Sequence, residues 1–397
     1  MLGLIRVLAR KDNRKTGTAI FFTAAVAFAA ILVYYIVRFS FPLRHDSATL
    51  YLLDYNFYYG TRIFIGSIYT LLAPHISENV IYAANLAAYL AGVALFIYTV
   101  STCVKSAKEL KNNTLVAAIP FFLLCPYSVL QFAGWVGAYD IWLCLAMLLC
   151  CLMVRNNVAK WFVPAVCVCA VFTHYAFVFS FFPAVVCAQF FMITRENSGR
   201  RAGDILSALL TFAATFASAV WCAFYAPATV KMSESELFGY MSERLGSAAG
   251  NWHYITSYYF SDAGNTEMLG GLMKSIYNSR MLMENALIFL PFFLFFAAVW
   301  AGCIAKSRRK TDRLKYAAFI AALLVSSAVI FFIIEANRWR AAAIISQVAL
   351  FCLCLKEDDA PLKNLMVSFG KKRYSALLIA LAIYGAYCLC IYQPHVY

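Results

Sequence analysis

Charged residues are scarce in this chain, in which Asp, Glu, Lys and Arg together make up 13% of 397 residues. A soluble globular domain carries about a quarter. Hydrophobic residues make up 63%, and several apolar runs reach the roughly 20 residues that a helix needs to cross a bilayer. The deficit of charge excludes a compact soluble globule and indicates a protein embedded in a lipid bilayer.

Nucleotide-binding motifs are also missing. The chain contains neither a P-loop phosphate-binding motif nor a glycine-rich dinucleotide fingerprint. No polar segment is long enough to form a cytoplasmic catalytic domain. An ATP-driven pump and a Rossmann-type enzyme are therefore disfavoured, and any chemistry must come from the ends of the spans and from their loops.

The fourteen cysteines lie in or beside apolar runs, which argues against a disulfide framework. Cys167 and Cys169, like Cys352 and Cys354, lack the spacing and the polar neighbours of a zinc site. They are interpreted as small apolar helix residues. No resident metal or cofactor is predicted from cysteine.

The net charge of +14 comes from basic residues that occur in short clusters between apolar runs. This distribution is typical of cytoplasmic membrane loops and not of a nucleic-acid-binding face. We expect the partners to be a lipid bilayer and its components, with no nucleic acid.

The apolar runs predict an all-α polytopic transmembrane bundle of about eleven spans in a single membrane domain, 1–397. The basic start, Arg6 to Lys15, continues into an apolar stretch without a cleavage site and is interpreted as a retained signal anchor. The spans are expected at 17–37, 79–103, 114–133, 139–154, 161–174, 176–194, 205–226, 285–305, 316–334, 341–355 and 374–392.

The basic residues also predict the orientation of the chain. With a cytoplasmic N-terminus, the predicted inner segments carry 24 of the 33 Lys and Arg residues, as the positive-inside rule requires. An odd number of spans then places the C-terminus outside. Eleven of the nineteen acidic residues fall on the outer side, together with the candidate functional residues.

Two outer loops are long, at 38–78 and 227–284. The first is predicted to hold an interfacial helix and then a re-entrant half-helix near 63–72. The second is expected to hold short amphipathic helices. One begins at the capping-box sequence Ser233-Glu-Ser-Glu236 and presents Leu237, Tyr240, Met241 and Leu245 on one face.

Asp46, Asp54 and Arg62 follow one another at intervals of eight residues in the first outer loop. On a helix they would point within about a quarter turn of one another. Asp54 or Asp46 could act as a catalytic base on an acceptor hydroxyl or hold a divalent cation. The alternative is a solvated loop with an ordinary ion pair.

Besides Arg62, four other places in the sequence are candidate substrate-binding positions. Ionisable residues at span ends usually face a bundle interior or a watery cavity. Asp140 either caps its helix or belongs to a site. His174, at the predicted hairpin tip, either exchanges a proton or is structural. The remaining two are the Arg338-Trp-Arg340 corner and the aromatic loop around Trp252.

The Arg338-Trp-Arg340 corner and the loop around Trp252 each have two interpretations. Arg338 and Arg340 suit a phosphate or diphosphate, because guanidinium groups form bidentate bonds to such oxygens. They would otherwise be interfacial anchors beside a tryptophan. Trp252 and its aromatic neighbours suit a sugar ring or lipid headgroups.

The stretch Leu53 to Ser67, Gly137-Ala-Tyr-Asp140, Thr173-His174 and Asn337-Arg-Trp-Arg340 resemble patches in bacterial membrane proteins of glycan assembly. The resemblance is to GT-C-like glycosyltransferases and to EpsG- or Wzy-like polysaccharide polymerases. It implies a multi-pass protein of the bacterial plasma membrane, acting within cell-envelope assembly. The implied partners are a polyprenyl-phosphate-linked sugar donor and a glycan acceptor on the outer face.

A transporter or lipid-linked-sugar flippase is the alternative from another class. It would require a charged or polar route through the whole bilayer. The charges cluster at span ends instead, and most mid-span positions are apolar. The sequence therefore favours a one-sided site over a transmembrane pathway.

Overall fold

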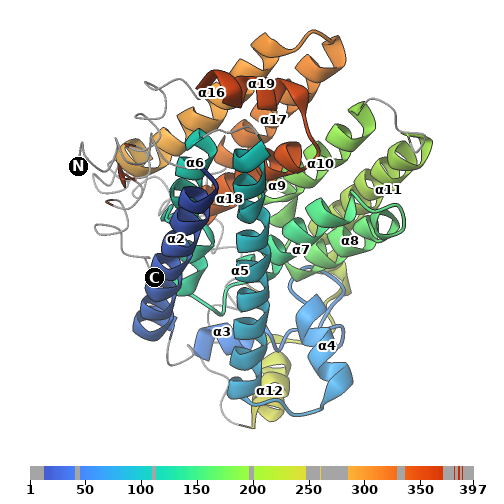
Figure 1. Ribbon diagram of the computed structural model, residues 1–397. Helices are drawn as coiled ribbons and strands as arrows, with labels where there is room; N and C mark the ends of the chain where they lie inside the picture. The colour runs from blue at the N-terminus through green and yellow to red at the C-terminus, as the bar shows by residue number, and fades with distance from the viewer. Residues whose placement is uncertain are drawn as a thin grey trace.

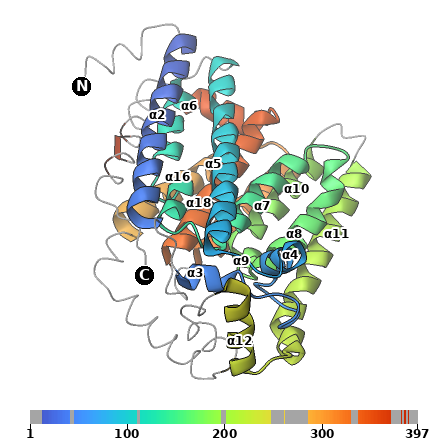
Figure 2. The same ribbon diagram turned by 90° about the horizontal axis from the view of Figure 1, so that it is seen from below.

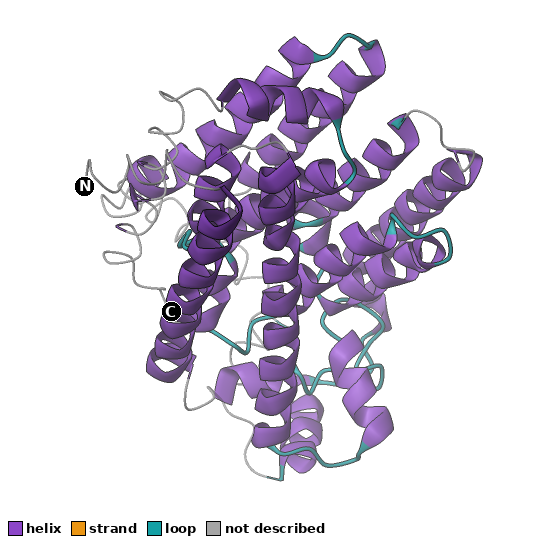
Figure 3. Ribbon diagram, viewed as in Figure 1, coloured by secondary structure: helices purple, strands orange, loops and turns teal. Residues whose placement is uncertain are grey.

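The computed structural model describes residues 13–40, 45–109, 113–195, 201–246, 260, 285–328, 336–369 and four isolated positions beyond 379. Within these residues the chain is 83% helical and has no strand, which confirms the predicted all-α class (Figure 3). Short turns connect most of the helices. The helical state follows from the long apolar runs, since a helix satisfies its own backbone in lipid.

Ten helices of the described residues make up the bundle between its two ends. They are α2 (Asn13–Tyr35), α5 (Glu78–Glu109), α6 (Asn113–Leu123), α7 (Asp140–Met153), α8 (Val163–Thr173), α10 (Phe182–Thr194), α11 (Arg201–Val220), α16 (Leu290–Lys306), α17 (Lys310–Ala328) and α18 (Ala336–Lys356). The other helices are α3 (His45–Leu50), α4 (Phe64–Leu72), α9 (Phe177–Ser180), α12 (Glu234–Leu245) and α19 (Ala360–Phe369). A 3₁₀ segment, η2 (Val129–Gly134), precedes α7.

Five helical stretches are long and apolar enough to cross a membrane. They are Ile20–Ser40, Glu78–Ser106, Arg201–Thr229, Leu287–Lys306 and Asn337–Lys356. In Asn337–Lys356, 94% of the 18-residue apolar segment is buried inside the protein, whereas the other four stretches expose most of their apolar segments. Helix α18 is therefore the centre of the bundle, and Figure 2 shows it between α16, α5 and α7.

Several predicted spans are interrupted helices. The run 114–133 is divided into α6 and η2 by a turn that contains Pro126. The run 161–194 is divided at His174, as the sequence predicted, into α8 and the pair α9 and α10. Hydropathy identifies apolar stretches, but a proline or a turn residue ends the helix within them. The predicted span at 374–392 lies almost entirely outside the described residues.

The two ends of the bundle differ (Figure 1). One end, called here the α12 end, carries α3, α4 and α12. The opposite end, called the α19 end, carries α19 and the turn between α16 and α17. Helix α19 was not predicted, because its amphipathic sequence is too short and too polar for a span.

A separate hydrophobic core forms at the α12 end. Its buried members include Tyr51, Tyr69 and Tyr139, together with Leu237 and Met241 of α12. The predicted capping box is confirmed, because Ser233 Oγ accepts a hydrogen bond from Glu236 N and the Glu236 carboxylate accepts one from Ser233 N at 2.8 Å. We call α3, the loop 51–63, α4 and α12 the cap.

Gly66 lets α4 lie directly on the backbone of the loop before it. A Cβ at Gly66 would lie 1.9 Å from the carbonyl oxygen of Leu53. Because a backbone atom cannot move aside as a flexible side chain can, Gly66→Ala is expected to lower the free energy of unfolding by about 1–3 kcal/mol. Thermal unfolding in detergent measures this change.

Gly92→Ala in α5 is the matched control. A Cβ there has no neighbour within 4 Å, and alanine stabilises a helix interior by about 0.5–1 kcal/mol over glycine. The control should therefore be neutral or stabilising. Equal effects of the two substitutions would contradict the packing argument for Gly66.

Candidate functional site

Asp140 and Arg338 form an ion pair at the α12 end, although 198 residues separate them in sequence. Helix α7 begins at Asp140, and α18 supplies Arg338. The Arg338 Nε donates to Asp140 Oδ2 at 2.5 Å, and the Asp140 side chain is 9% exposed. Tyr139, not Asp140, is the N-cap residue of α7, and it makes no side-chain cap bond. The carboxylate is therefore oriented by a cation and not by the helix end.

A pocket opens beside this pair, where η2 meets the start of α18. The Arg338 guanidinium lies over the Trp135 ring, 5.5 Å from its centroid, and keeps 15% of its side-chain surface exposed. An arginine so placed can exchange its carboxylate partner for another oxygen anion. The pocket is lined by Gln131, Phe132, Gly134, Trp135, Ala138, Asn337 and Arg338.

His174 and Arg62 meet next to the ion pair. The His174 Nε2 lies 3.3 Å from Arg62 Nη2, and His174 Nδ1 lies 3.1 Å from the backbone N–H of Ala176. A neutral imidazole has a lone pair on only one ring nitrogen. Either tautomer therefore leaves one ring N–H facing another donor, so this corner is rich in donors and suits an oxygen ligand.

Burial lowers the pKa of His174 well below its ordinary value, and the charges of Arg62 and Arg338 lower it further. The ring is thus neutral at physiological pH and can still donate or accept one hydrogen bond. Two guanidinium groups act on one imidazole here, and Asp140 is the carboxylate paired with one of them. The corner is an electropositive site in which a phosphate group would be stabilised.

Backbone contacts hold Arg62 in this position. Arg62 has a left-handed conformation, φ 68°, which is uncommon for a residue with a side chain. Ile63 N donates to the Phe172 carbonyl at 3.2 Å, and Tyr175 N donates to Thr61 Oγ1 at 2.9 Å. These bonds fasten the loop of the cap to both sides of His174.

Asp54 lies elsewhere in the cap and is saturated with donors. Its side chain is fully buried and accepts hydrogen bonds from Asn56 N at 2.8 Å, from Tyr240 Oη at 2.6 Å and from Thr70 Oγ1. Arg244 Nη1 completes the set at 3.0 Å. A carboxylate with four donors and no exposed surface holds structure together.

The helix assumed for Asp46, Asp54 and Arg62 is not present. Residues 51–63 form turns between α3 and α4, so the interval of eight residues does not bring Asp54 and Arg62 together. Asp54 contacts α12, whereas Arg62 contacts the tip of α8. Asp46 belongs to α3, but its side chain lies outside the described residues, as does all of Trp252.

Arg340 also departs from its predicted position. It is fully buried, and its Nη1 donates to Tyr127 Oη at 3.1 Å and to Asn337 Oδ1. Its guanidinium lies over the Tyr127 ring, 5.5 Å from the centroid. Arg340 therefore joins α18 to the turn before η2, and Arg338 alone of the two lines the pocket.

Sequence reasoning missed Arg244 and Tyr240 as partners of Asp54. A signal was present, because Arg244 follows Leu237 by seven residues and so lies on the apolar face of α12. A single cation on such a face indicates a buried carboxylate nearby. Among the described residues, no group of three or more His, Cys, Asp or Glu side chains could hold a metal ion.

No family model, curated protein or solved structure matches this chain. The fold shows an all-helical protein with five helical stretches, within the described residues, that are long and apolar enough to span a membrane. The site at its α12 end combines Arg62, Asp140, His174 and Arg338, which are four of the eight residues that the sequence singled out.

Proposed function

We propose that this protein is an integral membrane glycosyltransferase or polysaccharide polymerase that uses a polyprenyl-phosphate-linked sugar on the outer face of a bacterial plasma membrane. The observation that carries the proposal is Arg338, a partly exposed guanidinium on a pocket wall, paired with the buried Asp140. The positive-inside distribution supports an outer location for this end, because the turn from Lys306 to Lys310 lies at the opposite end.

The donor phosphate would replace Asp140 on Arg338, with Arg62 adding positive charge nearby. This exchange releases the Asp140 carboxylate as a general base for the acceptor hydroxyl. The acceptor oxygen then bonds to the anomeric carbon while the bond from that carbon to the phosphate oxygen breaks. The proton passes to Asp140, and the arginines stabilise the leaving phosphate.

This proposal moves the catalytic base from Asp54 to Asp140. Four donors already bind the Asp54 carboxylate, two of them from Tyr240 and Arg244 of α12, and none of its surface is exposed to a substrate. His174 orients substrate through its one available hydrogen bond. The proposed mechanism needs no metal ion.

Arg338→Ala should lower glycan product by at least about 100-fold, the usual cost of removing one donor to a developing anion. The measurement compares lipid-linked and surface glycans in cells that lack the protein and in cells that carry the variant at normal membrane levels. In both kinds of cell, an unextended lipid-linked intermediate should accumulate on the outer leaflet.

Arg308→Ala is the matched control, because Arg308 is an exposed arginine at the α19 end. It should leave product unchanged. An intermediate trapped on the inner leaflet would support a flippase instead. Glycans unaffected by both the deletion and Arg338→Ala would overturn the proposal.

A further inference from the structure

Asn337 lies next to Arg338 on the wall of the pocket, and its side-chain amide has a fixed orientation. Its Oδ1 accepts a hydrogen bond from Arg340 Nη1 and lies 3.5 Å from Tyr127 Oη, which also donates to it. A guanidinium group can only donate, so the atom that faces Arg340 must be the amide oxygen and not the amide nitrogen.

The partners of this oxygen are themselves held in place. Arg340 and Tyr127 are both fully buried, and Arg340 Nη1 donates to Tyr127 Oη at 3.1 Å. The three side chains therefore form a closed set of hydrogen bonds behind the pocket. Turning the Asn337 amide over would place its two N–H groups against a buried cation and remove an acceptor from that cation.

The amide nitrogen of Asn337 is the end that remains for a ligand. Asn337 is partly exposed, and its Nδ2 makes no hydrogen bond to any of the described residues. Since Asn337 lines the pocket together with Arg338, a single molecule bound there can contact both side chains. The pocket wall therefore presents a neutral donor beside a cationic one.

The polar side chains that line the pocket favour an anion. Arg338 and Trp135 carry only donors, as does the Asn337 nitrogen, and Gln131 is the one other lining side chain with an acceptor. A sugar hydroxyl needs an acceptor for its own proton. Phosphate oxygens accept from several donors at once, and hydrogen bonds to a charged oxygen are the stronger ones.

We propose that Asn337 binds the donor phosphate together with Arg338, by donating a hydrogen bond from Nδ2 to a phosphate oxygen. This inference rests on the proposed function and adds a second contact to the group that leaves in the reaction. Arg338 supplies the charge. Asn337 supplies a donor whose direction is already set before the substrate arrives, so little freedom is lost on binding.

Asn337→Asp tests the proposal, because it exchanges only the amide nitrogen for an oxygen. The other oxygen still accepts from Arg340, and the new charge lies near two guanidinium groups. The unfolding temperature in detergent should therefore stay unchanged or rise. Glycan product in cells should fall by at least about 10-fold, the worth of one hydrogen bond to a charged group. Loss of product without loss of stability is the signature of a binding role.

A second measurement detects binding directly. Farnesyl phosphate is a short polyprenyl phosphate, and farnesol is the same chain without the phosphate. A ligand that binds the folded protein raises its unfolding temperature. Farnesyl phosphate should raise the unfolding temperature of the unsubstituted protein more than farnesol does, and Asn337→Asp should abolish this difference.

Asn364→Asp is the matched control, because Asn364 is exposed on α19 and the substitution adds the same charge at the opposite end of the bundle. It should keep both the product and the response to farnesyl phosphate. Full product in Asn337→Asp would overturn the proposal, as would equal responses of the unsubstituted protein to the two probes.

A lower unfolding temperature of Asn337→Asp would also overturn the proposal, by assigning Asn337 to structure. Loss of product in Arg338→Ala would leave the proposed function standing in each of these cases.

Discussion

Asp54→Ala should lower the free energy of unfolding by about 3–5 kcal/mol, because it leaves the buried Arg244 guanidinium without its counter-charge. The Arg244 side chain is 5% exposed, and its Nη1 also donates to the Leu52 carbonyl at 2.7 Å. Its Nε and Nη2 have no partner within the described structure. Arg244 therefore has little compensation once the carboxylate is gone.

Thermal unfolding in detergent measures the loss of stability of the whole protein. Trypsin cleavage after Arg244 measures how far α12 comes away from the rest of the cap. Arg244 is protected while α12 is docked, so cleavage there should rise in Asp54→Ala. Adding Arg244→Met should restore part of the lost stability, since removing both charges costs less than removing one.

Lys105→Ala is the control for ordinary ion pairs. Lys105 and Glu109 are 3.8 Å apart and both exposed, so this change should cost less than about 1 kcal/mol. If Asp54→Ala were equally mild, or if the double variant were no more stable than the single one, the buried pair would not be what holds α12 in place.

The sequence predicted the parts of the molecule that depend on local chemistry. The capping box at Ser233, the apolar face of α12 and the break at His174 are all present. Each depends on residues within a few positions of one another, and short-range patterns report such interactions directly. The four patches that carried the family resemblance also include all four residues of the site.

What the sequence did not predict depends on packing between distant segments. Asp54 and Arg244 are 190 residues apart, and Asp140 and Arg338 are 198 apart. The interval of eight residues between Asp54 and Arg62 suggested a helix, but Tyr139 and the end of α8 hold this loop in turns. Hydropathy, similarly, does not reveal where an apolar run such as 114–133 is interrupted.

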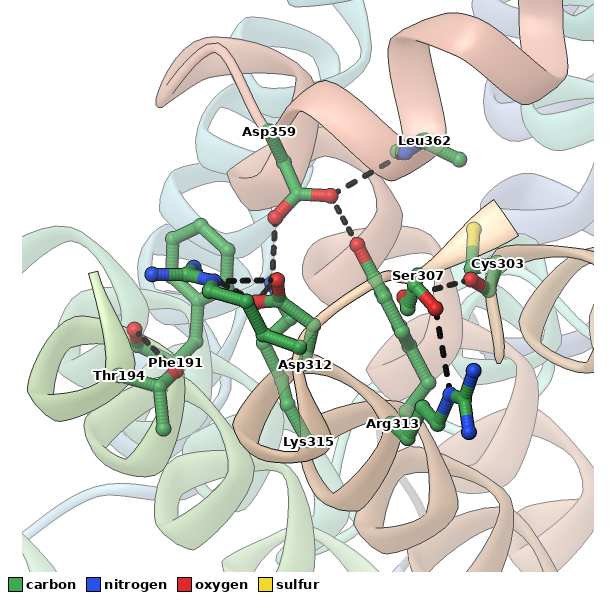
Figure 4. A network of polar contacts seen from close by, with 11 residues as sticks. Phe191, Thr194, Cys303, Ser307, Asp312, Arg313, Lys315, Asp359 and Leu362 are labelled. Atoms are coloured by element: carbon green, nitrogen blue, oxygen red, sulfur yellow. Dashed lines mark hydrogen bonds and ion pairs between the residues drawn. The ribbon is translucent and has the colours of Figure 1, made fainter. Parts of the chain in front are cut away.

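At the α19 end, Asp359→Asn should lower the free energy of unfolding by about 3–5 kcal/mol. Figure 4 shows the buried network that depends on this carboxylate. Asp359 accepts bonds from Lys315 Nζ and Tyr316 Oη, and from the backbone N of Leu362 at 3.2 Å. The Asp359 carboxylate therefore balances the charge of Lys315 on α17 and also caps the N-terminus of α19.

The loss would leave the Lys315 ammonium, 4% exposed, with Asp312 as its remaining carboxylate at 3.4 Å. Asp312 is already engaged by Arg309 at 2.9 Å. One carboxylate shared by two cations compensates less of the desolvation of Lys315 than two carboxylates do. The destabilisation should appear as a lower unfolding temperature of the whole bundle, because the network joins α17 to α19.

Asp358→Asn is the matched control on the adjacent residue. Asp358 is 71% exposed and pairs with Lys363, so removing its charge should change the free energy of unfolding by less than about 1 kcal/mol. Its left-handed backbone, φ 58°, is tolerated by asparagine as well as by aspartate, so no strain is added. A large effect of Asp359→Asn beside a small one of Asp358→Asn attributes the stability to the buried network. Equal effects would attribute it to the net charge of this end, which both substitutions change by the same amount.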